Sequence, residues 1–316
     1  MTGNHMIEAL SHGISCIDSG YHRPGLAACY LMVDDGEAAV IETATAPTLP
    51  TLLAALERCE VAPEQVRWIM PTHVHLDHAG GAGALLARCP NATLVVHPQG
   101  ARHLIDPSRL IAGAMAVYGE QGVREMYGEI VAAPAERVRQ APDGSRWPLG
   151  RRELLIRDTP GHARHHYCIW DEASRGWFTG DTYGIGYREL HCRGEPFLIP
   201  TTTPVQFEFE AMLSSLELLM ATEPRYCYLT HFGRVAASRK CTDALERQLR
   251  EYLRLAQASE PGEQRQQRLA AALLDHTVGL LRAAGNSSSA AELRELLAMD
   301  MDLNAQGLLV WLERQR

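Results

Sequence analysis

The 316-residue sequence lacks the features that mark several specialised classes of protein. No apolar run approaches the roughly 20 residues that a bilayer-spanning helix needs. The eight cysteines are widely spread with no Cys-x-x-Cys pair, which disfavours a zinc ribbon and a compact disulfide framework. The start, residues 1–6, has no basic-then-apolar pattern of a secretory signal. We therefore expect a soluble cytoplasmic protein with reduced, mostly buried thiols.

An excess of positive charge is also missing. The formal net charge is -8 and the isoelectric point is about 6.0, and no basic patch interleaved with aromatic residues is evident. This balance disfavours a nuclease and favours a small-molecule substrate, with neither nucleic acid nor membrane as partner. The apolar share of 46% and the charged share of 22% describe an ordinary globular protein, and the length suits one large α/β domain with an appendage.

The first hundred residues alternate between short apolar runs and turn residues. The runs at 14–17, 27–33 and 38–41 predict strands of a β-meander, because Gly and Asp-Asp-Gly signals separate them. Leucines at helical spacing predict a helix over 50–58, and a strand is expected over 66–70. A helix over 82–88 and a strand over 93–97 follow. The pattern is typical of a meander that leads into β-α-β units.

The remainder divides into three regions. Residues 98–142 are expected to form a mainly helical insertion over the site. Strands at 154–157, 167–170 and 177–179 predict a second β-rich half, and a late strand is expected over 225–229. From 236 to 316 the leucine periodicity predicts a helical C-terminal extension. Its apolar end is expected to pack on the main domain or to pair subunits as a homo-oligomer.

A dense cluster of metal-ligand side chains follows the expected strand at 66–70. His73, His75, Asp77 and His78 lie within six positions, and neutral imidazoles and carboxylates bind transition metals. On an extended segment His73 and His75 point the same way, so one metal can take both. Asp77 and His78 fall after the bend and can turn towards a second ion. The spacing therefore fits two adjacent metals on a strand-to-helix loop.

Three later residues follow predicted strands in the same manner. They are His162 in Thr159-Pro160-Gly161-His162, Asp181 after Gly180, and His231 after Thr230. Each one alone would more often be a hydrogen-bonded structural residue. Their shared position at strand ends, together with the first cluster, indicates a ligand role.

This order of motifs resembles the metallo-β-lactamase-fold superfamily, with its glyoxalase II-like and lactonase-like metallohydrolases. The resemblance covers residues 7–235 and implies a four-layer αββα sandwich with metals at one edge between the sheets, extended by the insertion at 98–142 and the tail at 236–316. Carried over by motif, it implies that one metal binds His73, His75 and His162, that the other binds Asp77, His78 and His231, and that Asp181 bridges them.

Two positions depart from the pattern of that family. Glu42 stands where Asp is usual, so it either orients the histidine loop or has only a packing role. The segment 161–166 reads Gly-His-Ala-Arg-His-His, where many relatives read Gly-His-Thr-x-Gly-His. His166 aligns with the second histidine and is interpreted as an orienting or structural residue. Arg164 and His165 are candidate substrate contacts.

The expected activity is hydrolysis of a small ester, thioester or lactone by hydroxide that bridges two divalent ions. Zinc is the first expectation, but the His and Asp ligands also suit iron or manganese. Asp77 is expected to orient the nucleophile as well as to bind metal. Tyr183, two positions after Asp181, is the first candidate for stabilising the oxyanion, with a packed aromatic as the alternative.

Two other classes of function stay open. The first is an iron-dependent oxidoreductase of the persulfide dioxygenase-like or flavodiiron-like type, although no glycine-rich flavin or dinucleotide fingerprint is present. The second is a non-catalytic ligand-binding protein on the same fold, which the complete ligand set disfavours. An antibiotic-degrading lactamase is disfavoured because no export signal is seen.

Overall fold

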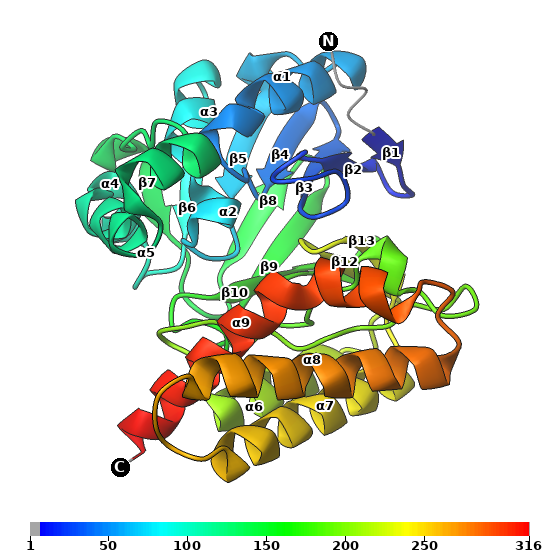
Figure 1. Cartoon of the computed structure of the whole chain (residues 1–316). Coiled ribbons are helices and arrows are strands. Elements are labelled where there is room, and N and C mark those ends of the chain that lie inside the picture. Colours follow the sequence, from blue (N-terminus) through cyan, green and yellow to red (C-terminus); the bar gives the residue numbers. More distant parts are fainter. Residues whose placement is uncertain (1–6, 316) are drawn as a thin grey trace. The chain divides into compact units, whose positions relative to one another are not determined.

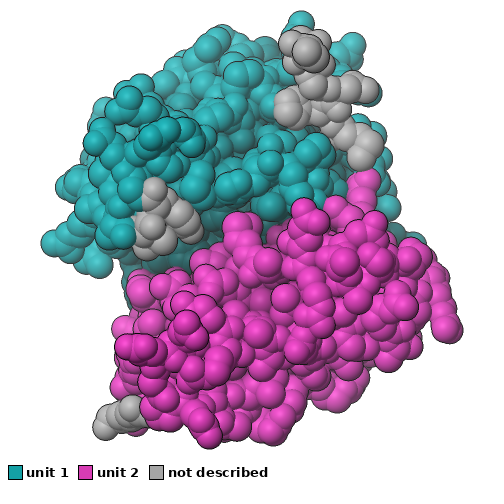
Figure 2. Space-filling view, in the orientation of Figure 1, with its two compact units in different colours: residues 1–158, 165–180, 225–234 teal, residues 159–164, 181–224, 235–316 magenta. Residues whose placement is uncertain are grey.

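The computed structural model describes residues 7–315, apart from the side chains of Val117 and Tyr118, so the predicted absence of a secretory signal at 1–6 concerns residues outside the described part. The chain forms two compact units (Figure 2). Unit 1 comprises residues 1–158, 165–180 and 225–234, and unit 2 comprises 159–164, 181–224 and 235–316. The predicted limits, 7–235 and 236–316, are continuous along the chain, whereas the two units interleave.

The first sheet of unit 1 has seven strands in chain order (Figure 1). They are β1 (Ile7–Ala9), β2 (Ile14–Asp18), β3 (Ala28–Asp34), β4 (Glu37–Ile41), β5 (Val66–Met70), β6 (Thr93–Val96) and β7 (Val138–Gln140). Strands β1 to β4 pair antiparallel, and β4 to β7 pair parallel. The carboxyl ends of β4 and β5 therefore meet at one edge, where a loop can present side chains.

Helices cover one face of this sheet. Helix α1 (Leu49–Arg58) buries Leu52 and Leu56, and α3 (Ala82–Arg88) buries Leu85 and Leu86. These leucines join Leu31 of β3 in one apolar cluster. The neighbouring side chain on β3, Tyr30, points to the opposite face, as strand alternation requires.

The segment predicted as a helical insertion is helical only in part. Helices α4 (Ala101–Ile105) and α5 (Ser108–Tyr127) occupy its first portion, after which the chain runs through η3 (Ala135–Arg137) into β7. Strand β7 pairs with β6 and extends the sheet. A three-residue strand carries too little periodicity to be recognised in a sequence.

The second sheet has the order β13-β12-β11-β10-β9-β8. Its strands are β8 (Arg146–Leu149), β9 (Arg152–Asp158), β10 (Tyr167–Asp171), β11 (Gly176–Gly180), β12 (Tyr226–Leu229) and β13 (Gly233–Ala236). The ring of Tyr30 on β3 lies 5.2 Å from that of Phe178 on β11, and its hydroxyl donates to the carbonyl of Leu229. The Tyr167 hydroxyl donates to the carbonyl of Val95 at 2.9 Å. The inner faces of the two sheets are thus in contact within unit 1.

Unit 2 is built largely from four helices, α6 (Phe209–Met220), α7 (Arg239–Ala258), α8 (Arg265–Ala284) and α9 (Ala290–Arg314). The Ser238 hydroxyl accepts a bond from the amide of Cys241 at the start of α7. Ser289 and Glu292 form a capping box on α9. Gly285 ends α8 in the left-handed conformation, at a φ of 85°. These end signals separate the helices of the predicted C-terminal extension.

The short elements are η1 (Ala46–Thr48), η2 (Pro63–Gln65), η4 (Arg188–Leu190) and α2 (Leu76–Ala79). Two β-sheets with helices, followed by a helical C-terminal segment, confirm the predicted α/β fold class. In the described part of the chain, no helix combines the length and apolar character that a membrane span requires.

Candidate metal centre

The histidine loop links β5 to α2 in unit 1. His73 is fully buried just after the strand, and His75 precedes α2 in an extended conformation, with φ -62° and ψ 149°. Asp77 and His78 lie in the first turn of α2. The chain therefore bends between His75 and Asp77, at the place where the sequence predicts a change of direction.

His73 and His75 bring two ring nitrogens together. Nε2 of His73 lies 2.8 Å from Nδ1 of His75. The other nitrogen of His73, Nδ1, lies 3.2 Å from the Thr72 hydroxyl, to which it donates because that hydroxyl gives its own proton to Glu42. Nε2 of His73 is then the lone-pair nitrogen. Two ligand atoms on one tetrahedral metal are about 3.4 Å apart, so a small opening of this pair admits an ion.

Asp77, His78 and His231 form a second group in unit 1. Oδ2 of Asp77 lies 3.5 Å from Nε2 of His78 and 3.4 Å from Nε2 of His231. The ligand atoms of the three residues all lie within 4.8 Å of one another. These separations match the ligand spacing of about 3.4 Å around a tetrahedral ion. The group thus offers two nitrogens and one carboxylate oxygen at metal-binding distance.

Glu42 connects the strands that carry these ligands. Its Oε1 accepts bonds from the Thr72 hydroxyl at 2.6 Å, from Nδ1 of His78 at 3.1 Å and from the Thr230 hydroxyl at 3.0 Å. Its Oε2 accepts the Thr72 amide at 3.2 Å. A φ of 62° turns the backbone after β4, so that the longer Glu side chain points at these donors. Of the two roles considered for Glu42, the contacts support orientation of the histidine loop.

The remaining ring nitrogens are also occupied by protein acceptors. Nδ1 of His231 donates to the carbonyl of Leu26 at 2.8 Å, and Nδ1 of His78 donates to Glu42. Each bond places the proton on Nδ1 and leaves Nε2 to face Asp77. Leu26 carries no sequence signal for this role, because it acts through its backbone.

Two more predicted ligands lie in unit 2. Nε2 of His162 is 3.4 Å from Oδ2 of Asp181. Nδ1 of His162 donates to the Thr201 hydroxyl at 3.2 Å, and that hydroxyl donates to the carbonyl of Asp181 at 2.9 Å. His162 and Asp181 are therefore a second oriented pair. Thr201 was missed in the sequence because it is remote from both.

The residues of segment 164–166 have different surroundings. The His166 ring is fully buried and lies 4.9 Å from that of His73, which agrees with an orienting or structural role. The His165 ring lies 5.7 Å from that of His75. The Arg164 guanidinium lies 3.3 Å from the Glu208 carboxylate in unit 2. That ion pair gives Arg164 a partner in the protein itself.

Tyr183 is buried within unit 2. Its hydroxyl lies 2.8 Å from that of Thr242 and also donates to the carbonyl of Ser238. Both partners belong to the start of α7. This placement supports the alternative of a packed aromatic, and it argues against the oxyanion role that proximity to Asp181 suggested.

Gly180 allows the second sheet to approach the histidine loop. Its φ is 48°, and a Cβ placed there would lie 2.4 Å from Oγ1 of Thr72 and 2.5 Å from Nε2 of His166. Both distances are far below van der Waals contact, so only glycine fits.

The Cys29 thiol has a raised pKa. Burial and then the Glu42 carboxylate raise the pKa of this thiol well above its usual range. This thiol is therefore protonated at neutral pH.

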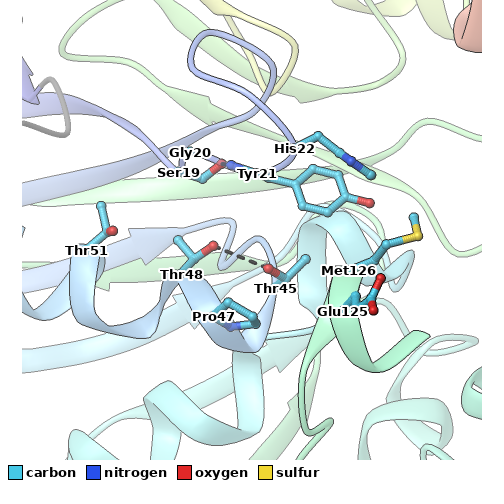
Figure 3. A pocket seen from close by; sticks show the side chains of 10 residues that line it. All are labelled: Ser19, Gly20, Tyr21, His22, Thr45, Pro47, Thr48, Thr51, Glu125 and Met126. Carbon is cyan, nitrogen blue, oxygen red and sulfur yellow. Dashed lines mark hydrogen bonds between the residues drawn. The ribbon is translucent and has the colours of Figure 1, made fainter. Parts of the chain in front are cut away.

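A cleft of about 420 Å³ lies in unit 1 (Figure 3). It is lined by Ser19, Gly20, Tyr21, His22, Thr45, Pro47, Thr48, Thr51, Glu125 and Met126. Tyr21 also packs against the apolar group that contains Leu76, the residue between His75 and Asp77. Tyr21 thus contacts both the cleft and the apolar group beside the ligand loop, and the volume lies in the range of small-molecule sites.

The family model described as the metallo-β-lactamase superfamily matches residues 22–231. The metallo-β-lactamase fold-containing protein ST1585 of Sulfurisphaera tokodaii is 25% identical over 182 residues, which are 55% of this chain and 63% of ST1585. The match therefore spans less than two thirds of that relative. A hydroxyacylglutathione hydrolase of Cronobacter sakazakii is 28% identical over 244 residues, 71% of this chain and 78% of the relative.

Solved structures show the same fold. The crystal structure of ST1585 has a TM-score of 0.64 at 21% identity, with 95% of this chain and 99% of that chain covered. A metallo-β-lactamase family protein of Thermus thermophilus, TTHA1429, has a TM-score of 0.64 at 20% identity, with 92% and 89% covered. Because the family model matches well over half of the sequence, this chain belongs to the metallo-β-lactamase superfamily.

Proposed function

We propose that this protein is a metal-dependent hydrolase whose centre holds two divalent transition-metal ions. The observation that carries the proposal is the geometry in unit 1, where His73 and His75 converge and a separate trio of Asp77, His78 and His231 lies at tetrahedral ligand spacing. In His73, His78 and His231, the ring nitrogen that faces away from the centre donates to a protein acceptor. Such bonds fix the tautomer that a metal needs.

We further propose that His162 and Asp181 complete the centre, with Asp181 between the ions. Chain connectivity supports this. Asp181 directly follows Gly180, and Gly180 pairs with Leu229 of the parallel strand β12, two residues before His231. His162 lies in the loop that joins β9 to β10, four residues before His166, whose ring packs against His73. Each of these two residues thus follows the end of a strand of unit 1 by no more than four positions along the chain.

Ions held in this way supply Lewis acidity and lower the pKa of water towards neutrality. The protein residues then have separate tasks. Among the trio in unit 1, Asp77 is the most accessible, with 27% of its side chain exposed, so its second oxygen can accept a proton from an attacking water. His78 and His231 are held by Glu42 and Leu26 and stay fixed while Asp77 contacts solvent.

A small ester, thioester or lactone is the substrate class that we propose. The relative named hydroxyacylglutathione hydrolase supports this class by analogy, and the cleft beside Tyr21 has room for the part of a substrate that does not react. Hydroxyl groups of Ser19, Thr45 and Thr48 line the cleft, so we expect that part to be polar. A panel of thioesters and lactones with polar and apolar side groups tests the assignment directly.

The first expected result concerns metal content. Purified protein should contain close to two transition-metal ions per chain, because the ligands form two sets that share Asp181. Elemental analysis of protein prepared without chelator measures the metal content, and the substrate panel measures the hydrolase activity. If the protein instead contains iron and oxidises sulfur compounds, the proposed hydrolase function is wrong and the protein is an oxidoreductase. Failure of zinc, iron and manganese to bind the metal-free protein would refute the metal centre itself.

The second expected result concerns Glu42. Glu42→Gln should lower metal affinity by about 10- to 100-fold, the usual effect of losing a group that orients a ligand. The replacement amide has an NH2 group in place of one oxygen, whereas Thr72, His78 and Thr230 all donate to the Glu42 carboxylate. One bond is therefore lost whichever way the amide turns. Competition with a chromogenic chelator measures the change.

Glu37→Gln is the matched control. It makes the same chemical change, but Glu37 is the first residue of β4, where it pairs with Arg67 at the surface, whereas Glu42 follows the other end of that strand. Its metal affinity should equal that of the wild type. Equal affinities in the Glu42 and Glu37 variants would show that Glu42 does not orient the loop.

A further inference from the structure

Helix α9 is bonded to the segment 200–202 by Asn304. The Asn304 amide nitrogen donates to the carbonyl of Pro200 at 3.0 Å, and its Oδ1 accepts the amide of Thr202 at 2.6 Å. The Thr202 hydroxyl donates to the carbonyl of Asn304 at 2.9 Å. All of these groups belong to unit 2 and are buried. One side chain thus holds the residue on each side of Thr201.

Gly307, one turn after Asn304, brings the helix backbone against the same segment. A Cβ at Gly307 would lie 1.5 Å from the carbonyl oxygen of Thr202, a distance that no side chain can tolerate. The close approach lets Asn304 reach both backbone partners at once. The contact between α9 and segment 200–202 is therefore specific in shape as well as in hydrogen bonding.

Thr201, between these two anchors, is the residue that orients the ligand pair of unit 2. Its hydroxyl accepts from Nδ1 of His162 and donates to the carbonyl of Asp181. Asn304 holds the backbone on each side of Thr201. A continuous series of bonds therefore runs from α9 through segment 200–202 to both His162 and Asp181.

We propose that Asn304 is a positioning residue of the metal centre. It acts through segment 200–202: by fixing Thr201 it sets the ring orientation of His162 and the backbone position of Asp181. The inference rests on the proposed function, because it requires these two residues to be metal ligands. It gives the C-terminal helical segment a task in forming the centre, in addition to covering apolar surface.

The chemistry of the amide makes the proposal specific to Asn. Asn304 must donate to one carbonyl and accept from one amide, which Asp cannot do because a carboxylate has no donor. Asn304→Asp should therefore turn an oxygen towards the Pro200 carbonyl and displace the segment. Thr201→Val, which has the same shape without the hydroxyl, should release His162 directly. Thr201→Ser, which keeps the hydroxyl, should behave as the wild type.

Tyr187→Phe is the matched control. The Tyr187 hydroxyl donates to Oδ1 of Asp300, four residues before Asn304 on the same helix, in the same buried unit. Removing it deletes a buried hydrogen bond between α9 and a part of unit 2 that lies outside segment 200–202. A merely structural effect of losing such a bond should appear in this variant as well.

The experiment measures cobalt(II) and zinc(II) binding by the full-length chain, through chelator competition and the cobalt absorption spectrum, with a thermal midpoint for each variant. Asn304→Asp and Thr201→Val should each lose about 10- to 100-fold in affinity for the more weakly held ion and alter the cobalt spectrum. The double variant should lose no more than the larger single loss, because both changes break one series of bonds. Tyr187→Phe and Thr201→Ser should bind as the wild type does.

Three outcomes overturn the inference. Unchanged affinity in Asn304→Asp, while the wild type binds two ions, overturns it and leaves the proposed function standing. Equal losses in Tyr187→Phe and Asn304→Asp show a general effect of destabilising α9. A wild type that binds no metal removes the proposed function and this inference together. If Asn304→Asp fails to fold, the comparison of Thr201→Val with Thr201→Ser decides alone: equal binding by these two excludes the series of bonds.

Discussion

Asp181→Ala is expected to lower turnover by a factor of about 10³ or more and to reduce metal content. The proposed position of Asp181 between two ions means that its loss weakens both, and the Lewis-acid contribution of a bound ion is worth several kcal/mol, each 1.36 kcal/mol being tenfold in rate. Oδ2 of Asp181 lies 3.4 Å from Nε2 of His162, and the backbone carbonyl stays bonded to Thr201. The substitution thus removes the carboxylate and leaves the backbone anchor.

Tyr183→Phe is the comparison for this variant, since it changes a neighbour of Asp181. Its hydroxyl is buried against Thr242 and Ser238, so we expect a stability loss of about 1 kcal/mol with metal content and turnover retained. Elemental analysis and initial rates on the identified substrate separate the two roles. Full metal content and activity in Asp181→Ala would exclude the bridging assignment. A large loss of turnover in Tyr183→Phe at unchanged metal content would instead support the role of Tyr183 in stabilising the oxyanion.

Local patterns predicted strands β2 to β6 of the first sheet and helices α1 and α3, but not the three-residue strand β1. The predicted ranges 66–70 and 82–88 are those of β5 and α3, because apolar spacing and flanking turn residues marked both ends. The remaining predicted strands agree to within about two residues, the usual uncertainty of element ends. By contrast, β7 and α6 were not identified, because neither was distinguished from its flanking segments by spacing alone.

The candidate site could be located from the sequence, but its support could not. His73, His75, Asp77 and His78 are neighbours in the chain, so their chemistry is visible as a motif. The groups that hold them are remote or are backbone atoms: the Leu26 carbonyl lies 205 residues from His231, and Thr201 lies 39 residues from His162. A single sequence gives no sign of such contacts, because the partners are far apart in the chain or act through backbone atoms. For Tyr183, the sequence offered only its place two positions after Asp181, and it gave no sign that the hydroxyl lies against Thr242 of α7.

The interleaving of the two units also depends on contacts between segments that are remote in the sequence. Residues 159–164 and 181–224 belong with the C-terminal helices through contacts such as Gln248 to the Leu198 carbonyl, at 2.8 Å, and Asn304 to Pro200. A boundary drawn from leucine periodicity finds where the helices begin, which is Arg239 for α7. It cannot find which earlier segments complete their core.

Deleting residues 235–316 is expected to abolish soluble folding of unit 2. Tyr183, Tyr187 and Phe207 are fully or almost fully buried, and their partners Thr242, Asp300 and Trp311 all belong to the deleted helices. Uncovering a large apolar side chain costs about 1.5–3 kcal/mol. Several such losses together are comparable to the roughly 5–15 kcal/mol that stabilise a typical domain. Loss of Asn304 should also release the segment that orients His162 and Asp181.

The measurements are soluble yield, mass in solution, metal content and turnover of a chain that ends at Arg234, beside the full-length chain. We expect aggregation, because the uncovered residues form exposed apolar surface. Supplying residues 235–316 as a separate polypeptide should restore part of the soluble yield and the metal content if the helices complete the core of unit 2. Pairing of subunits through the tail predicts instead a soluble truncated chain with a smaller assembly mass. A soluble truncated chain with unchanged mass, metal content and kinetics would show that the helices neither complete this core, nor pair subunits, nor position the ligands.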